Sequence, residues 1–295
     1  MVRSFNHGDG DTGAGAVTVA RGGCPLHAML GVTRGADGPG RGGITAGGVV
    51  VFAYGLLAYA AFFGTILYAI GFVGNWFVPK SIDSGAGAGY AEAILVNGGI
   101  LVLFVAQHTV MARSWFKAWW TRIIPASIER STFVFLASAI LMALFWQWRP
   151  LPGVVWSVEH PAAVYGLNAL SLAGWGVVFA SSFMVSHFDL FGLRQSLFGL
   201  LGLRYRPVGF RLVGLYKVVR HPLMVGFLIA FWSAPTMTEG RLLFAALTTG
   251  YIFFGTWIEE RSLIAEHGET YEAYRRRVRG FIPIPRSAPD ERGAA

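Results

Sequence analysis

Four polar clusters interrupt the long apolar runs of this 295-residue chain. The first spans residues 107–113 and contains His108, and the second spans 186–195 and contains His187 and Asp189. A histidine can accept or donate a proton near neutral pH, and a nearby carboxylate can orient its ring or raise its basicity. We therefore regard these two histidines and this aspartate as candidates for acid–base chemistry.

The pairing of His187 with Asp189 requires a break in the helix, because side chains two positions apart on a continuous helix diverge. Gly192 follows closely and favours such an end. The alternative for this segment is a polar helix cap. For His108 the alternative is a packing histidine that is hydrogen-bonded to a neighbouring backbone.

The third cluster, residues 215–226, contains Arg220, His221 and Pro222, with Gly226 one turn further on. Proline suits the first turn of a helix, where its missing amide hydrogen is not needed. The positive end of that helix would face the preceding loop and favour a carboxylate ligand. A glycine one turn into the helix would let another group approach closely.

The fourth cluster begins with Glu259 and Glu260 and continues to Tyr271, Tyr274 and the arginines at 275–277. The carboxylates could bond ribose hydroxyls or a cationic ligand, and the tyrosines could cover an adenine. The alternative is an amphipathic helix that lies on anionic lipid through its arginines. That alternative leaves two acids at the end of an apolar helix unexplained.

The composition indicates that these clusters sit in a membrane protein. Hydrophobic residues make up 54% of the chain and charged residues 14%, against about 25% charged in soluble domains. The net charge of +8 is spread among apolar runs, so no nucleic-acid partner is expected. Six apolar runs are long enough to be considered as spans. They cover residues 47–73, 91–112, 132–148, 162–186, 222–237 and 241–258.

These runs predict an all-α, polytopic transmembrane helix bundle in a lipid bilayer. It has five full spans, or six if both arms of a C-terminal hairpin turning at 238–240 cross. The first arm would reach roughly 24 Å at 1.5 Å per residue, short of the roughly 30 Å hydrocarbon core. Three tryptophans, Trp76, Trp148 and Trp156, fall at predicted interfaces.

The basic residues predict the orientation of the bundle. If the N-terminus is cytoplasmic, 21 of the 24 lysines and arginines lie inside, as the positive-inside rule requires. Both termini and all four clusters then face the cytoplasm from the inner membrane. Residues 1–44 contain Cys24 but no signal-peptide core, and we expect a disordered, Gly-rich cytoplasmic tail. One cysteine provides neither a disulfide nor a metal site.

The third and fourth clusters also carry a recognisable pattern. Arg220-His221-Pro222-x-x-x-Gly226, followed by Glu259-Glu260-x-x-Leu263 and Gly268-x-x-Tyr271-x-x-Tyr274, resembles the isoprenylcysteine carboxyl methyltransferase superfamily of membrane methyltransferases. Within it, segments 107–113, 187–195, 215–238 and 282–286 are similar to the bacterial methanethiol S-methyltransferases. The resemblance covers residues 45–286, which we treat as the membrane methyltransferase domain, with a flexible tail at 287–295.

The resemblance implies an enzyme that uses S-adenosylmethionine, bound by the part of the domain at 187–286. The implied cofactor contacts are Tyr216, Arg220, His221, Pro222, Gly226, Glu259, Glu260, Tyr271 and Tyr274. The implied substrate is a small thiol: methanethiol would yield dimethyl sulfide, or hydrogen sulfide would yield methanethiol.

A thiolate is the nucleophile in such a transfer, so a base must accept the thiol proton. Either His187, oriented by Asp189, or His108 would be that base. Gln107 and Arg194 would shape the acceptor site.

Other functions stay open at this point. One is carboxyl methylation of a prenylated or otherwise lipophilic acceptor, and another is a reductase that binds NADPH through a related C-terminal region. A third is a membrane haem protein with His108 and His187 as axial ligands. The sequence predicts no metal site and does not define the oligomeric state.

Overall fold

The structure is a computed structural model, and it describes residues 43–208 and 212–284. The predictions for Cys24, for residues 1–42 of the N-terminal tail and for the tail at 287–295 lie outside these residues.

Five helices are long and apolar enough to cross a membrane. They are α2 (Ala46–Gly74), α3 (Tyr90–Met111), α5 (Ala126–Gln147), α6 (Pro161–Val185) and α10 (Glu239–His267). Helix α9 (Pro222–Trp232) has 11 residues, which gives a length of about 16 Å. The all-α bundle with five full spans is therefore confirmed, and the first hairpin arm is a partial span.

Shorter elements connect these helices. They are α4 (Ser114–Trp120), β1 (Val154–Ser157), α7 (His187–Leu190), α8 (Leu193–Leu200), the 3-10 turn η1 (Gly214–Lys217), β2 (Thr236–Thr238) and α11 (Glu269–Arg277).

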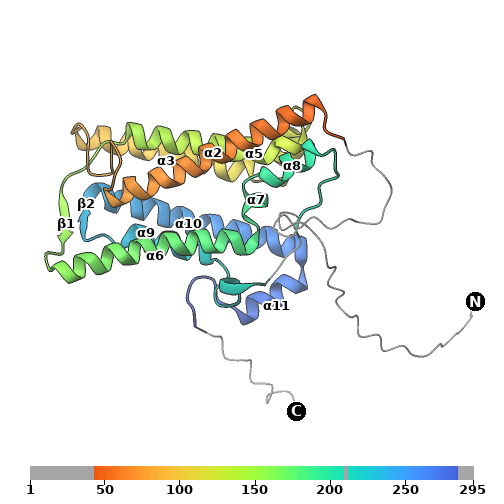
Figure 1. The fold of residues 1–295 in the computed structure, drawn as a ribbon. Coiled ribbons are helices and arrows are strands. Elements are labelled where there is room, and N and C mark those ends of the chain that lie inside the picture. Colours follow the sequence, from red (N-terminus) through yellow and green to blue (C-terminus); the bar gives the residue numbers. More distant parts are fainter. Residues whose placement is uncertain (1–42, 209–211, 285–295) are drawn as a thin grey trace, which may run out of the picture. The chain divides into compact units, whose positions relative to one another are not determined.

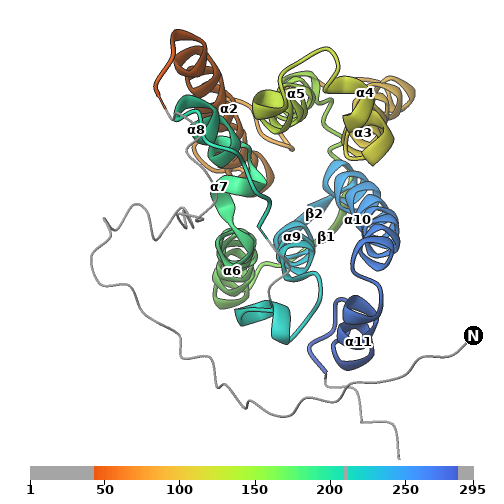
Figure 2. The ribbon, with the colours of Figure 1, turned by 90° about the vertical axis from the view of Figure 1, so that its right-hand side faces the viewer.

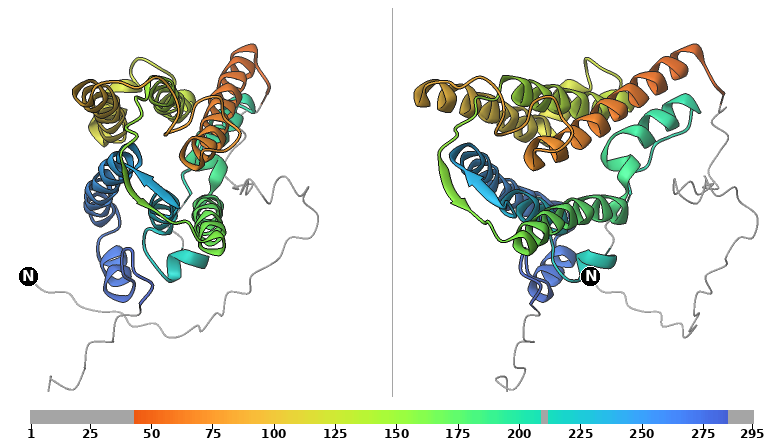
Figure 3. Two further views of the ribbon diagram at one scale, coloured as in Figure 1. Left: turned by 90° about the vertical axis from the view of Figure 1, so that its left-hand side faces the viewer. Right: turned by 60° about the vertical axis from the view of Figure 1, so that its left-hand side comes forward.

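The six apolar helices form two layers of three. Helix α5 lies between α2 and α3 in one layer, and α9 lies between α6 and α10 in the other (Figures 1 and 2). The two further views show the same arrangement (Figure 3). In the second layer the backbones of α6 and α9 approach very closely. A Cβ atom on Gly226 would lie 2.7 Å from the carbonyl oxygen of Gly174, a packing that only small residues allow.

A two-stranded ribbon explains why α9 is short. Strands β1 and β2 pair antiparallel, with Val154 opposite Thr238 and Ser157 opposite Thr236. The predicted run to Met237 is wrong at its end, because Pro235 disfavours helical backbone before it and the chain then extends into β2. Thr238 caps α10 by accepting a hydrogen bond from the amide of Arg241 at 3.2 Å. We call this end of the bundle the ribbon end.

Two helix boundaries differ from the predicted runs in ways that matter for function. Helix α5 begins at Ala126, directly after Pro125, rather than at Thr132. Helix α10 continues to His267, well beyond Ile258. Side chains that were assigned to loops, Arg130 among them, therefore lie on helices inside the bundle.

The larger of the two hydrophobic core clusters lies towards the ribbon end and includes Phe72, Phe145, Trp148 and Phe244. Trp148 lies at the end of α5, but it does not face lipid as a residue of an aromatic belt would. Its side chain is fully buried, and its indole N–H donates to the carbonyl of Ile82 at 2.9 Å. A loop carbonyl thus satisfies the polar atom that would otherwise have favoured the membrane interface.

Candidate active site

The four polar clusters gather at the end of the bundle opposite the ribbon, which we call the α11 end. Helices α6 and α10 end there and α9 begins there, because β1 and β2 hold their other ends together (Figure 1). Helix α3 ends there as well, since the guanidinium of Arg113 donates to the hydroxyl of Ser262 on α10 at 3.4 Å. The prediction that all four clusters share one end is confirmed.

Arg220, His221 and Glu260 form a compact network where α9 begins. The Arg220 guanidinium donates through Nε at 2.8 Å and through Nη2 at 2.7 Å to Oε1 of Glu260. The Nε2 atom of His221 lies 2.9 Å from the same oxygen. The other carboxylate oxygen of Glu260 lies 3.3 Å from Nε of Arg275. Glu260 is therefore fully engaged by the protein itself.

The segment that follows α11 contacts this network through backbone hydrogen bonds. The amide of Arg220 donates to the carbonyl of Arg279 at 2.8 Å, and the amide of His221 donates to that of Gly280 at 3.0 Å. Pro222 occupies the first turn of α9, as predicted. Backbone carbonyls accept from the two amides before the proline, so these two amides are not available to a ligand. The carboxylate site expected at the first-turn amides of α9 itself stays a prediction.

Glu259 differs from its neighbour in having capacity left for a ligand. Its side chain is 51% exposed, and its carboxylate lies 3.8 Å from Nδ1 of His221, beyond hydrogen-bonding distance. Tyr216 lies close enough to interact with it: burial raises the pKa of the Tyr216 hydroxyl, and the negative charge of Glu259 raises it further. Glu259 and Tyr216 are thus the members of this cluster that could meet a ligand.

Tyr271 and Tyr274 have a supporting role in this structure. Both are buried, with 1% and 6% of their surface exposed, and the Tyr274 hydroxyl donates to the carbonyl of Tyr216 at 2.6 Å. Burial raises the pKa of Tyr274 to about 12, so this hydroxyl remains a donor. They hold α11 beneath the Tyr216 turn and do not present an open face to an adenine. Gly226 likewise packs against α6 and is not open to a ligand.

His187 is held on both sides by hydroxyl groups. Its Nε2 atom lies 2.9 Å from the hydroxyl of Tyr59 on α2, and its Nδ1 atom lies 2.8 Å from the hydroxyl of Ser182 on α6. The Phe183 ring stacks on it at 4.2 Å. Burial lowers the pKa of His187 and favours the neutral ring.

The predicted pairing of His187 with Asp189 is wrong, although the helix does break there as expected. Helix α6 ends at Val185, and Ser186 has a φ of 148°. After this break the His187 ring turns towards α2, and its two nitrogens are used by hydroxyls. The same geometry argues against an axial haem ligand, because neither nitrogen is left to bind iron.

Asp189 belongs instead to a network that braces α8. It accepts hydrogen bonds from Arg194 Nη1 at 3.0 Å and from the Tyr205 hydroxyl at 2.9 Å. Gln195 donates to the same hydroxyl at 3.2 Å. Burial and the Asp189 carboxylate raise the pKa of Tyr205 to about 12. Arg194 is therefore committed to protein partners, and Tyr205 is a member of the network that nothing in the spacing indicated.

His108 contrasts with His187 because its ring makes contacts but no hydrogen bonds. It lies 4.7 Å from the Phe133 ring on α5 and 6.2 Å from the Tyr251 ring on α10. Within the described part of the chain, its buried Nδ1 atom has no hydrogen-bond partner, nor has the buried Oε1 atom of Gln107. The alternative of a packing histidine bonded to backbone is not what the structure shows.

Arg130 completes this region and was missed as a site residue. Its guanidinium lies 4.9 Å from the centre of the Phe133 ring, and its Nε donates to the carbonyl of Leu190 on α7 at 2.8 Å. From the sequence alone, Arg130 is one of the basic residues expected on the cytoplasmic side and nothing more. With α5 starting at Ala126, its position three residues before Phe133 would have placed both side chains on one helix face.

The comparisons with known proteins agree on one kind of protein. Methanethiol S-methyltransferase 1 of Bradyrhizobium diazoefficiens is 52% identical over 238 residues, 81% of this chain and 84% of that protein. Methanethiol S-methyltransferase of Mycobacterium tuberculosis is 49% identical over 79% of this chain and 95% of that protein. Nurim of Sus scrofa is 30% identical over 56% of this chain. No family model and no solved structure matches the chain.

Proposed function

Because this chain belongs to the methanethiol S-methyltransferase family, we propose that it transfers a methyl group to methanethiol, giving dimethyl sulfide, with S-adenosylmethionine as donor. The observation that carries the proposal is the pair of regions at the α11 end. One holds an exposed carboxylate suited to a cationic donor, and the other holds unpartnered polar atoms suited to a small acceptor.

The residues around α9 fit such a donor. S-adenosylmethionine supplies a methyl group already activated by a positively charged sulfonium. Glu259 would bind a cationic or hydroxyl-bearing part of the ligand, since its side chain is half exposed and its carboxylate lies 3.8 Å from Nδ1 of His221, beyond hydrogen-bonding distance. Tyr216 would lie beside it. Arg220, His221 and Glu260 would position these two groups by joining α9 to α10 and α11.

His108 is the group best placed to accept the thiol proton. An acceptor thiol must lose its proton, because the thiolate is the nucleophile. A base needs a nitrogen lone pair that no other group uses, and the buried Nδ1 atom of His108 has no partner in the described structure. The thiol S–H bond would break as the proton passes to the imidazole, which returns it to solvent after methyl transfer.

Arg130 and Gln107 would complete the acceptor site. A guanidinium beside the sulfur would stabilise the thiolate, and this stabilisation is large where water is excluded. Arg130 lies beside the Phe133 ring that His108 also contacts. Gln107 donates to the carbonyl of Phe133 at 3.2 Å, which leaves its Oε1 atom directed at no protein group within the described chain.

The orientation follows from the bundle and the basic residues together. Helix α2 begins at the α11 end and α10 finishes there, so the described chain enters and leaves the bundle on one side (Figure 1). The arginine-rich segments around Arg113, Arg220 and 275–277 lie at that end as well. The positive-inside rule supports an orientation in which the α11 end faces the cytoplasm.

The test uses purified protein, methanethiol and S-adenosylmethionine carrying a 13C methyl group. We expect labelled dimethyl sulfide in the headspace by gas chromatography–mass spectrometry, and a large loss with His108→Asn. The matched control is His160→Asn, because His160 is an exposed histidine at the ribbon end. Dimethyl sulfide without the label would reject the donor. No dimethyl sulfide above a mock purification would reject the reaction.

A further inference from the structure

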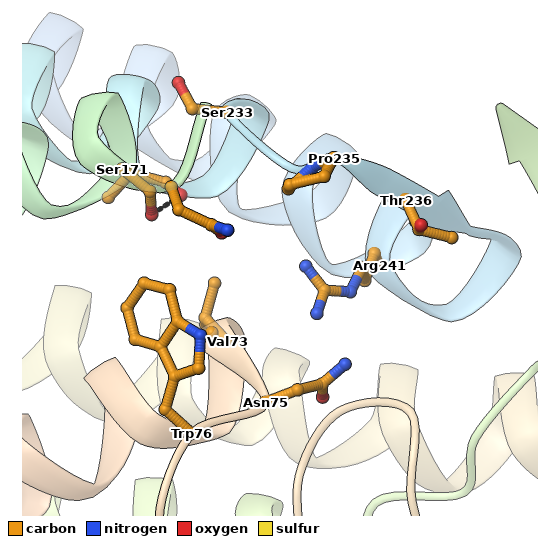
Figure 4. Close-up of a pocket in the computed structure, with 11 residues that line it drawn as sticks. Val73, Asn75, Trp76, Ser171, Ser233, Pro235, Thr236 and Arg241 are labelled. Carbon is orange, nitrogen blue, oxygen red and sulfur yellow. Dashed lines mark hydrogen bonds between the residues drawn. The ribbon is translucent and has the colours of Figure 1, made fainter. Parts of the chain in front are cut away.

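A pocket of about 260 Å³ lies at the ribbon end, far along the bundle from the candidate active site. It is lined by the last residues of α2, by α6 and α9, and by the residues that lead into α10 (Figure 4). Its walls include Trp76, Asn168, Ser233 and Arg241. The reaction proposed above uses none of these residues.

Arg241 is the charged group of this pocket, and it is only partly satisfied by the protein. Its side chain is 10% exposed, and its Nε donates to Oδ2 of Asp83 at 2.6 Å. Within the described chain, no hydrogen bond is made by its two terminal nitrogens. Figure 4 shows its guanidinium directed into the pocket, towards the side on which Trp76 and Ser171 lie.

The carboxylate of Asp83, beside Arg241, already accepts hydrogen bonds from three protein groups. Asp83 accepts from Arg241, from Nδ2 of Asn75 at 2.7 Å and from the hydroxyl of Thr238 at 2.6 Å. These three donors occupy the carboxylate, and Arg241 is the one among them that carries a positive charge. Its carboxylate is therefore not available to bind a cation in the pocket, and it orients the guanidinium so that the terminal N–H groups face inwards.

Two further groups of the pocket can donate hydrogen bonds to a ligand. Among the residues that the structure describes, no hydrogen-bond partner is found for the Trp76 indole nitrogen or the Asn168 amide, and both residues line the pocket. A guanidinium, an indole N–H and an amide around one space favour a ligand rich in acceptor oxygens.

We propose that this pocket binds a phosphate group. A guanidinium matches phosphate geometry through its parallel N–H donors, and the remaining donors satisfy the other oxygens. The pocket lies where α2 ends and α10 begins, which is the depth of the phospholipid headgroups at that membrane face. At this face, opposite to the α11 end, a headgroup phosphate would reach the pocket from the bilayer surface. The phosphate could belong to a phospholipid or be free in solution.

The test is a binding titration of the full-length protein after lipid removal in a neutral detergent. The probes are dioctanoyl phosphatidylglycerol, inorganic phosphate and dioctanoylglycerol, which lacks the phosphate. Binding is measured by native mass spectrometry and by the shift in thermal unfolding midpoint. Saturable binding of phosphatidylglycerol alone supports a lipid phosphate, and binding of inorganic phosphate as well supports a soluble one. Failure of both to exceed dioctanoylglycerol overturns the proposal.

Variants locate the binding in this pocket. Asn168→Leu removes a donor without disturbing Asp83. The double variant Asp83→Asn with Arg241→Gln removes the cation without leaving an unpaired acid. We expect each loss to weaken phosphate binding, by about tenfold for the double variant. Arg149→Gln is the matched control, because Arg149 lies at the same end and pairs with Glu92 outside the pocket. Equal affinity in the control and all pocket variants would overturn the assignment.

Discussion

His108 and His187 lie at the same end of the bundle, each close to the end of a membrane-spanning helix, yet they have opposite hydrogen-bonding states. Both nitrogens of His187 contact hydroxyl groups, at 2.9 and 2.8 Å. His108 touches aromatic rings, and its buried Nδ1 atom has no partner in the described structure. The difference separates a histidine that joins helices from one that can take up a proton. It is the reason why we propose His108 on α3, rather than His187 after α6, as the base.

Replacing His108 should give the largest effect on this comparison. With His108→Asn we expect turnover to fall by about 10²–10⁴, the range for a lost general base. His187→Asn should lower turnover much less when it is measured at a temperature where the variant remains folded. Initial rates of dimethyl sulfide formation at saturating donor give both values. The assignment is reversed if His187→Asn causes the larger loss in a folded protein.

Arg130→Gln tests whether the His108 region holds an anion. We expect turnover to fall by about 10²–10³, as for other preorganised groups that stabilise developing charge. The rate should recover as pH rises, because a thiol without its cation needs more alkaline conditions to ionise. Arg130→Lys should retain part of the rate, and Arg122→Gln, an exposed arginine beyond α4, is the control. A uniform loss at every pH would show that Arg130 only supports the fold.

Tyr59→Phe tests the structural role of the His187 region. It removes one hydroxyl and leaves the Nε2 atom of a buried histidine without a partner, which costs about 1–3 kcal/mol of unfolding free energy. Tyr54→Phe is the matched control on the same helix, because that hydroxyl bonds the side chain of Thr132 and not an imidazole. Thermal unfolding in detergent measures both. Equal midpoints for the two variants would mean that the contact with His187 does not stabilise the bundle.

The pH dependence of stability should show the smallest effect. Burial lowers the pKa of His187 below its ordinary value of 6.5. The unfolded chain therefore binds this proton more readily than the folded one, and stability falls as pH drops below 6.5 towards the folded value. His187→Asn should flatten this part of the profile, whereas His160→Asn should not. If the stability of wild type and of His187→Asn fell in parallel as pH drops, His187 would not be the source of this pH dependence.

The sequence predicted the features that follow from hydrophobicity and charge along the chain. Apolar runs located the five spans, and the distribution of arginine brought the four clusters to one end. It could not predict partners that come from distant helices. Tyr59 lies 128 residues from His187, and Tyr205 lies 16 residues from Asp189, in the irregular segment beyond α8, so no local spacing revealed either contact.

Two further predictions failed because the start of one helix and the neighbour of another were not known. Arg130 was treated as a loop charge because the apolar run starts at Thr132, whereas the helix begins six residues earlier, after Pro125. Gly226 was interpreted as room for a ligand, yet the group that approaches it is the backbone of α6 at Gly174. In both cases the residue type was informative, but the role of the residue depends on which neighbouring helix it contacts.

The backbone contact between the segment before α9 and the segment after α11 also links two stretches of chain that are made at different times. The amides of Arg220 and His221 donate to the carbonyls of Arg279 and Gly280, which are synthesised only after α10 and α11. The segment before α9 therefore reaches the geometry described above only once α10 and α11 have been made and packed. A chain truncated within α11 would keep the five long helices and would leave both amides without these backbone partners.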